Sequence, residues 1–305
     1  MQGRRPKTMK HIFERKTLPA MILVLAILMG LFLSPSAFAE KSPSSYEPAI
    51  SVRNWDLEEV DSFIENACVY AEYKAGTIYE NDFAFVYIPK STPKLMNYGF
   101  LFPGNNYGFA APVQCIESVC EYYYPRSVFV YVKESGLATL NKEDGVLFRC
   151  GEILKSISKD TGVIPHNIGV VGYSNGGYTA LHVAAYLIDE FNLNIPKVTI
   201  LDMGQQWRKR EFLITEEQAK PMLEAGTEIY HFTRGGETAN NNRVQEFMEN
   251  GIPLYEVACK CGASHGEILS YAFAYETIFW AVGDYNSLDK KIYDQPVLVN
   301  PDKVA

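Results

Sequence analysis

Residues 167–177 read NIGVVGYSNGG, and a helical pattern of apolar residues starts directly after them. The apolar run at 168–171 predicts a buried strand. The segment Gly172–Gly176 has the form Gly-x-Ser-x-Gly, which between a strand and a helix predicts a sharp turn centred on Ser174. Its two glycines relieve the crowding between the strand and the helix. The turn therefore presents the Ser174 oxygen at the strand's end, beside an Asn175 N–H that can stabilise negative charge at the helix N-terminus.

Strand and helix patterns alternate along most of the chain. Strand patterns lie at 82–88, 96–102, 127–132, 197–201, 227–232 and 254–259, and helix patterns at about 54–72, 110–124, 141–162, 215–225, 242–250 and 267–282. The alternation predicts an α/β fold with a mostly parallel central sheet and helices on both faces. The short interval between the strands at 197–201 and 227–232 leaves room for only a minimal cap.

The N-terminal segment has the pattern of an export signal. Several Lys and Arg residues precede an apolar run from Met21 to Leu33, and the small-x-small sequence Ala37-Phe38-Ala39 follows. We therefore expect a signal peptide at 1–39 and a single domain at 40–305, secreted or extracytoplasmic in the cell envelope. The apolar run is short for a membrane span, but an uncleaved leader that anchors the protein is the alternative.

Charge and cysteine content narrow the class of protein. The formal net charge is −8 and includes the basic leader, so the exported part is more acidic still and nucleic acid is not an expected partner. The six cysteines follow the leader, and an even number in an exported chain permits disulfides, although buried thiols are an equal alternative. Cys259 and Cys261 lack a second ligand pair at zinc spacing, so no metal site is predicted.

Together, the turn around Ser174 and the small-residue turn around His265 resemble the α/β-hydrolase family. The resemblance implies a Ser-acid-His order, with Ser174 as nucleophile and His265 as base. It leaves two carboxylates open as the acid. Glu237 is the only carboxylate in the loop after the 227–232 strand, where the family usually carries its acid, and we favour it for that reason. Asp202 ends the strand after the nucleophile strand, where some lipase-like members carry theirs.

The same resemblance implies an oxyanion hole. The segment Pro103-Gly104-Asn105-Asn106 follows the 96–102 strand, where the family often has a His-Gly-Gly motif, but the histidine is missing here. Gly104 would let the backbone approach the substrate, and the N–H of Asn105 or Asn106 would join that of Asn175 as a donor. Aromatic candidates for the substrate pocket are Tyr107, Tyr173 and Trp207.

These residues imply an exported serine hydrolase, in particular a carboxylic-ester hydrolase that works through an acyl-enzyme. Its substrate would be a small-molecule or cell-envelope ester, and no cofactor or metal is needed. A membrane would be a partner only through an uncleaved leader. A peptidase or an acyltransferase would use the same residues. A hydrolase fold that lost turnover and serves as a binding module is the non-enzymatic alternative.

Overall fold

The computed structural model describes residues 55, 57–90, 95–104, 126–133, 136–203, 212–233, 251–260, 265, 271–283, 288–290 and 292–299 of the 305 in the chain. All of them belong to the compact unit Ile50–Ala305. The predicted leader at 1–39 lies outside these residues. None of the helices within the described ranges has the length and apolar character that a bilayer crossing requires.

A ten-stranded sheet runs through the described residues, in the order β1-β2-β3-β5-β4-β6-β7-β8-β9-β10. Its strands are β1 (Cys68–Glu72), β2 (Gly76–Glu80), β3 (Ala84–Pro89), β4 (Leu95–Phe102), β5 (Val128–Val132), β6 (Ile164–Tyr173), β7 (Lys197–Leu201), β8 (Glu228–Thr233), β9 (Leu254–Ala258) and β10 (Val297–Val299). The strands from β5 to β9 in this order pair in parallel, and those outside them pair antiparallel. The predicted, mostly parallel sheet is confirmed.

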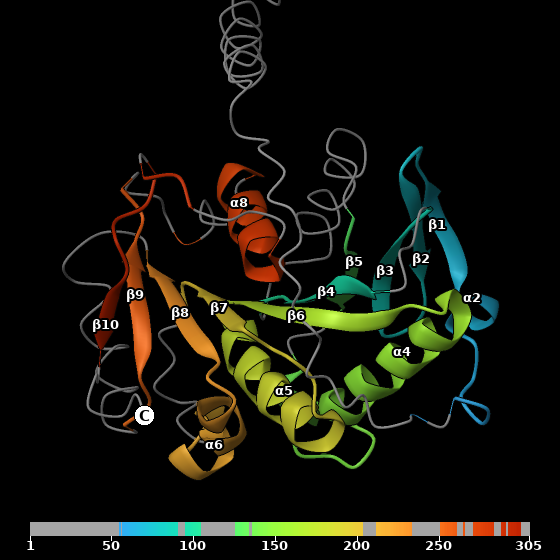
Figure 1. Cartoon of the computed structure of the whole chain (residues 1–305), viewed down its shortest axis with the longest axis horizontal. Coiled ribbons are helices and arrows are strands. Elements are labelled where there is room, and N and C mark those ends of the chain that lie inside the picture. The colour runs from blue at the N-terminus through green and yellow to red at the C-terminus, as the bar shows by residue number, and fades with distance from the viewer. Residues whose placement is uncertain are drawn as a thin grey trace, which may run out of the picture. The chain divides into compact units, whose positions relative to one another are not determined.

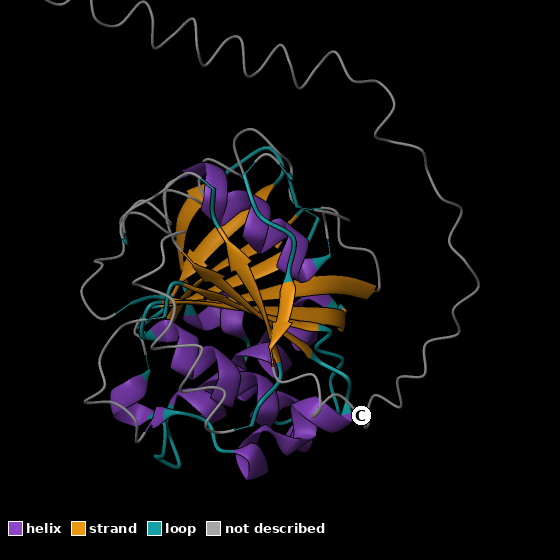
Figure 2. Ribbon diagram, turned by 90° about the vertical axis from the view of Figure 1, so that its left-hand side faces the viewer, coloured by secondary structure: helices purple, strands orange, loops and turns teal. Residues whose placement is uncertain are grey.

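Helices cover both faces of the sheet, as predicted. They are α2 (Phe63–Asn66), α4 (Val146–Thr161), α5 (Gly176–Phe191), α6 (Glu216–Glu224) and α8 (Tyr271–Val282), with a short 3₁₀ turn, η1 (Leu137–Thr139). In Figure 1, α4, α5 and α6 lie below the sheet and α8 lies above it. Figure 2 shows the same layers from the side. Two clusters of buried apolar side chains correspond to these two faces.

Strand β6, at the centre of the sheet, presents alternate residues to the two clusters. Ile168 and Val170 pack in the cluster on the α4 and α5 side, whereas Val171 and Tyr173 pack in the cluster on the α8 side. Gly169 also faces α8, and a Cβ there would lie 2.6 Å from the α8 backbone. The glycine thus lets α8 cross directly over the strand that leads to Ser174.

The predicted helix at 54–72 is wrong over most of its length. Among the described residues of this range only the four of α2 are helical, and 68–72 instead forms β1, which pairs antiparallel with β2. The helical spacing of apolar residues was misleading, because Val69 and Tyr70 favour a strand once β2 supplies a partner. By contrast, α4 ends at Gly162, as predicted, with a left-handed φ of 66°.

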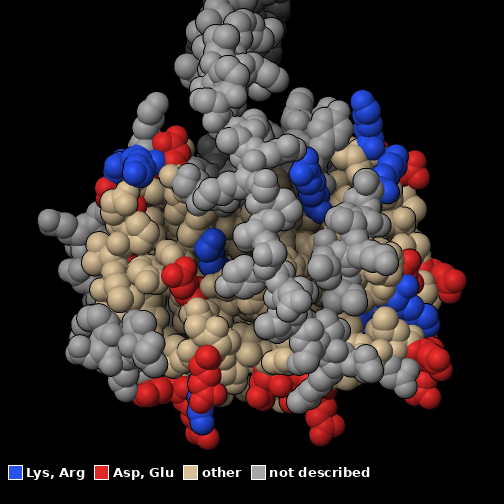
Figure 3. Space-filling model, in the orientation of Figure 1, with Lys and Arg blue, Asp and Glu red and all other residues tan. Residues whose placement is uncertain are grey.

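Acidic side chains gather along the lower edge of the face shown in Figure 3, the side on which α6 lies. Helix α6 carries Glu216 and Glu217 in its first turn, where their negative charges interact favourably with the positive end of the helix dipole. The three-residue spacing of Thr215 and Gln218 predicts a capping box at its start, and in the structure these two residues bond reciprocally to each other's backbone N–H groups.

Candidate active site

Ser174 lies in the turn between β6 and α5 with a left-handed backbone φ of 52°. Its N–H donates to the Leu201 carbonyl of β7 at 2.9 Å. A Cβ at Gly172 would lie 2.3 Å from the Gly176 carbonyl oxygen, and a Cβ at Gly176 would lie 2.3 Å from that of Phe102. No side chain fits at either position, so both glycines are needed for the strained turn that presents the serine.

The structure joins Ser174, His265 and Asp202 in one series of contacts. His265 Nε2 lies 3.1 Å from Ser174 Oγ, and His265 Nδ1 lies 2.5 Å from Asp202 Oδ2. The Asp202 side chain is fully buried, whereas that of His265 is 33% exposed. With Asp202 ionised, Nδ1 carries the proton and donates to the carboxylate. Nε2 is then the acceptor that faces the serine hydroxyl.

Asp202 follows directly after β7, in a turn that β8 holds in place. Its φ is 42°, a left-handed conformation that aspartate tolerates better than most residues. The Asp202 N–H donates to the Phe232 carbonyl at 2.8 Å, and the Met203 N–H donates to His231 Nε2 at 3.4 Å. His231 lies within β8 and is fully buried. Its contact with this turn was not predicted, because it depends on the pairing of β7 with β8.

The carboxylate that contacts His265 in the structure is not the one that the sequence favoured. Glu237 lies outside the described residues, and the atom that a triad acid would contact, His265 Nδ1, is bonded to Asp202. The parallel register explains this placement. Tyr173 pairs with Leu201, so the next residue of each strand, Ser174 and Asp202, emerges at the same edge of the sheet. In the sequence, the feature that best indicates this acid is therefore an aspartate directly after the strand that pairs with the nucleophile strand.

The candidate oxyanion region is described in part. Asn175 directly precedes α5, and no acceptor for its backbone N–H is found among the described residues. Gly104 is buried, and a Cβ there would lie 3.0 Å from Ser174 Cβ. The chain after β4 therefore approaches the serine closely, as the oxyanion prediction requires. The other predicted residues of this region, Asn105, Asn106, Tyr107 and Trp207, lie outside the described residues.

Tyr173, predicted as a substrate-pocket residue, is 3% exposed and packs beside His265. Its ring is stacked on the imidazole with 4.9 Å between centroids. Its predicted place in the substrate pocket stays a prediction.

Comparison with known proteins finds likeness at the level of structure. No family model and no curated protein matches the chain. An esterase from Rhizomucor miehei matches at 14% identity over 72% of this chain and 82% of its own, with a TM-score of 0.44. The fluorophosphonate-binding serine hydrolase F of Staphylococcus aureus matches at 12% identity over 72% and 98%, with a TM-score of 0.45. A bacterial heroin esterase matches at 14% identity over 87% and 90%, with a TM-score of 0.43.

The fold is α/β-hydrolase-like. The strand order, the helices on both faces and the sharp turn after β6 all agree with this description. At these identities and TM-scores, no activity or substrate is carried over from the matched proteins to this chain.

The cysteines of this hydrolase-like fold differ in state. Cys68 is an exposed free thiol and Cys150 is a buried one, and burial raises the pKa of the Cys150 thiol well above its usual range. Cys259 forms a disulfide whose partner lies outside the described residues. Within the described residues, no three His, Cys, Asp or Glu side chains are grouped so that they could hold a metal ion.

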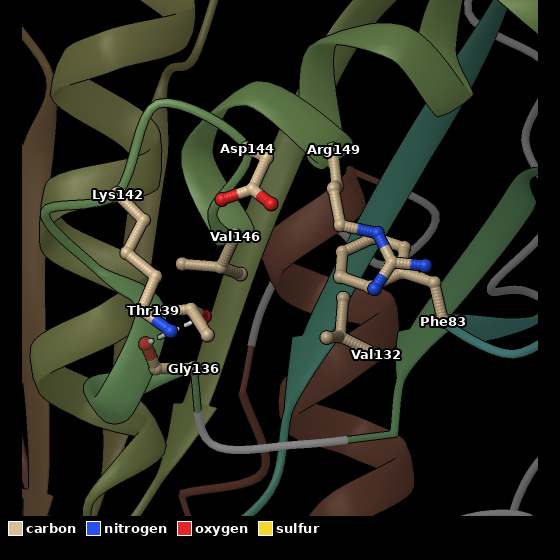
Figure 4. Close-up of a pocket in the computed structure, with 8 residues that line it drawn as sticks. All are labelled: Phe83, Val132, Gly136, Thr139, Lys142, Asp144, Val146 and Arg149. Atoms are coloured by element: carbon tan, nitrogen blue, oxygen red, sulfur yellow. Dashed lines mark hydrogen bonds between the residues drawn. The ribbon is translucent and has the colours of Figure 1, made fainter.

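A cavity of about 150 Å³ lies where η1 and α4 follow β5 (Figure 4). It is lined by Phe83, Val132, Gly136, Thr139, Lys142, Asp144, Val146 and Arg149. Arg149 is already engaged, because its guanidinium lies over the Phe83 ring and binds Asp82 at 2.7 Å. The candidate active site is a separate feature, since its three side chains are absent from the lining.

Proposed function

We propose that this chain is a serine hydrolase that cleaves carboxylic esters through an acyl-enzyme. Ser174 is the nucleophile, His265 the general base and then the general acid, and Asp202 the carboxylate that orients and stabilises the imidazole. The observation that carries the proposal is the continuous series of contacts from Asp202 Oδ2 through the imidazole to Ser174 Oγ. A strained serine backbone at the start of α5 supports it further.

In the first half of the reaction, Ser174 Oγ attacks the ester carbonyl carbon while its proton moves to His265 Nε2. The carbonyl oxygen becomes an oxyanion. The backbone N–H of Asn175 donates to it, and we assign the second donor to the loop after Gly104, to Asn105 or Asn106. The tetrahedral intermediate then collapses, the bond to the alcohol oxygen breaks, and Nε2 returns its proton to the departing alkoxide.

In the second half, water replaces the alcohol. His265 Nε2 takes a proton from the water as its oxygen attacks the acyl carbon, and the second tetrahedral intermediate expels Ser174 Oγ, which regains the proton. Asp202 remains ionised throughout and stabilises the imidazolium that forms in each half. The buried position of its carboxylate makes this stabilisation stronger than it would be in water.

The proposal is tested by fluorophosphonate labelling and by hydrolysis of p-nitrophenyl acetate. We expect the wild type to label and turn over, and Ser174→Ala and His265→Ala to do neither above background. Ser156→Ala is the matched control, because Ser156 lies on α4, donates to the Asp61 backbone carbonyl at 2.8 Å and has no part in the contacts among Ser174, His265 and Asp202. A folded wild type that neither labels nor hydrolyses esters overturns the proposal and supports a binding module instead.

The substrate class and compartment are part of the same proposal. We infer a small-molecule or cell-envelope ester as the substrate and a secreted or extracytoplasmic location through residues 1–39. N-terminal sequencing of the exported protein should begin at Glu40, whereas an intact leader in the membrane fraction would indicate an anchor instead. Hydrolysis of p-nitroanilides would point to a peptidase, and ester formation with added alcohols would point to an acyltransferase.

A further inference from the structure

Tyr173 contacts His265 in two ways. Its phenolic O–H donates to the His265 backbone carbonyl at 2.8 Å, which ties β6 to the chain segment that carries the histidine. Its ring also stacks on the imidazole, with 4.9 Å between centroids and 27° between planes. One contact holds the backbone of His265 and the other holds its side chain, so Tyr173 restrains both the position and the plane of the imidazole.

The surroundings of Tyr173 keep its own side chain in one place. It is 3% exposed and belongs to the buried cluster on the α8 face of the sheet. A Cβ at Gly104 would lie 3.1 Å from Tyr173 Cδ1, so the chain after β4 closes against the ring. Its backbone is fixed by pairing with Leu201. A rigid aromatic ring is therefore held directly beside the only imidazole that contacts Ser174 among the described residues.

The imidazole needs such a restraint because it must satisfy two partners at once. Nδ1 faces Asp202 and Nε2 faces Ser174, so a rotation of the ring about its bond to Cβ would lengthen both contacts. The His265 side chain is 33% exposed, and water around its exposed part does not hold the ring in one orientation. The stacked phenol ring covers one face of the imidazole and resists that rotation.

We propose that Tyr173 is a positioning residue, which sets the plane of the His265 imidazole and its distance from Ser174. This role rests on the proposed esterase function and deepens it. Tyr173 acts through the histidine, on which its ring is stacked. Its ring and its hydroxyl carry separate parts of the task, since the ring fixes the plane and the hydroxyl fixes the backbone.

Two substitutions separate these parts. Tyr173→Phe removes only the hydrogen bond and should lower kcat about fivefold. Tyr173→Leu removes the stacking as well and should lower kcat about fiftyfold, with KM changed less than about twofold. The control is Phe129→Leu, which truncates a buried ring of the same cluster that packs on Phe279. It should lose as much thermal stability as Tyr173→Leu and keep the wild-type kcat.

A spectroscopic measurement tests the same inference without turnover. The proton shared by His265 Nδ1 and Asp202 should give a far-downfield proton NMR resonance in the resting wild type and in Tyr173→Phe. It should be broadened or lost in Tyr173→Leu and retained in Phe129→Leu. Persistence of the resonance in Tyr173→Leu, or its absence from the wild type, overturns the inference even if the protein proves inactive on esters. If Phe129→Leu loses as much kcat as Tyr173→Leu, Tyr173 contributes only ordinary packing and the inference is wrong.

Discussion

Asp202→Asn should lower kcat by about a thousandfold and leave KM nearly unchanged. In the proposed mechanism His265 takes the serine proton and becomes an imidazolium in the transition state, with Nδ1 2.5 Å from the Asp202 carboxylate. With charge centres about 4 Å apart and an effective dielectric constant of about 20, the attraction is worth about 4 kcal/mol. Each 1.4 kcal/mol changes a rate about tenfold, which gives the predicted loss. The substituted amide can also donate to Nδ1, and this favours the unproductive tautomer.

The assay is p-nitrophenyl acetate hydrolysis at saturating substrate, with circular dichroism to show that the variant is folded. KM should stay within about threefold of wild type, because a fully buried side chain that contacts the base has no contact to lose with the substrate. Glu237→Gln is the comparison, since the sequence favoured that residue, and it should keep most of the wild-type kcat. If Glu237→Gln loses much more rate than Asp202→Asn, the assignment of the acid is wrong.

Three further predictions concern stability. Gly169→Ala should lower the free energy of unfolding by about 3 kcal/mol, because its Cβ meets the α8 backbone. Gly162→Ala should lower it by about 1 kcal/mol, because its Cβ meets only open space and the cost comes from the φ of 66°. Urea unfolding compares the two variants. Burial lowers the pKa of His182 in the folded protein, so the unfolded chain binds more protons below about pH 6.5 and stability should fall as the pH drops through that value. His182→Gln should reduce this slope between pH 7.5 and 5.5, and an unchanged slope would refute the assignment. Ser174→Gly should be more stable than Ser174→Ala by about 1 kcal/mol. Both variants lose the hydroxyl, but glycine alone adopts the φ of 52° without strain. Equal melting temperatures of the two variants would contradict this.

Local patterns predicted the parts of the fold that depend on neighbouring residues. The strand, turn and helix around Ser174 were predicted because the glycines that the turn requires lie within two residues of the serine. The capping box at Thr215 and the end of α4 at Gly162 are local in the same sense. The hairpin of β1 and β2 was missed because its strands are stabilised by each other and by β3, and the apolar spacing before Ala71 also suits a helix.

The sequence alone was enough to single out Ser174 and His265 as a pair, because a serine in a strained turn and a histidine in a small-residue turn each leave a local motif. Which carboxylate reaches the histidine is decided by strand order. Strand β7 lies beside β6 with Tyr173 opposite Leu201, and this register brings Asp202 to the edge of the sheet where Ser174 emerges. The same tertiary arrangement places the Tyr173 ring against the His265 imidazole and its hydroxyl on the His265 carbonyl. Both outcomes depend on pairing between segments far apart in the chain, which no local pattern encodes.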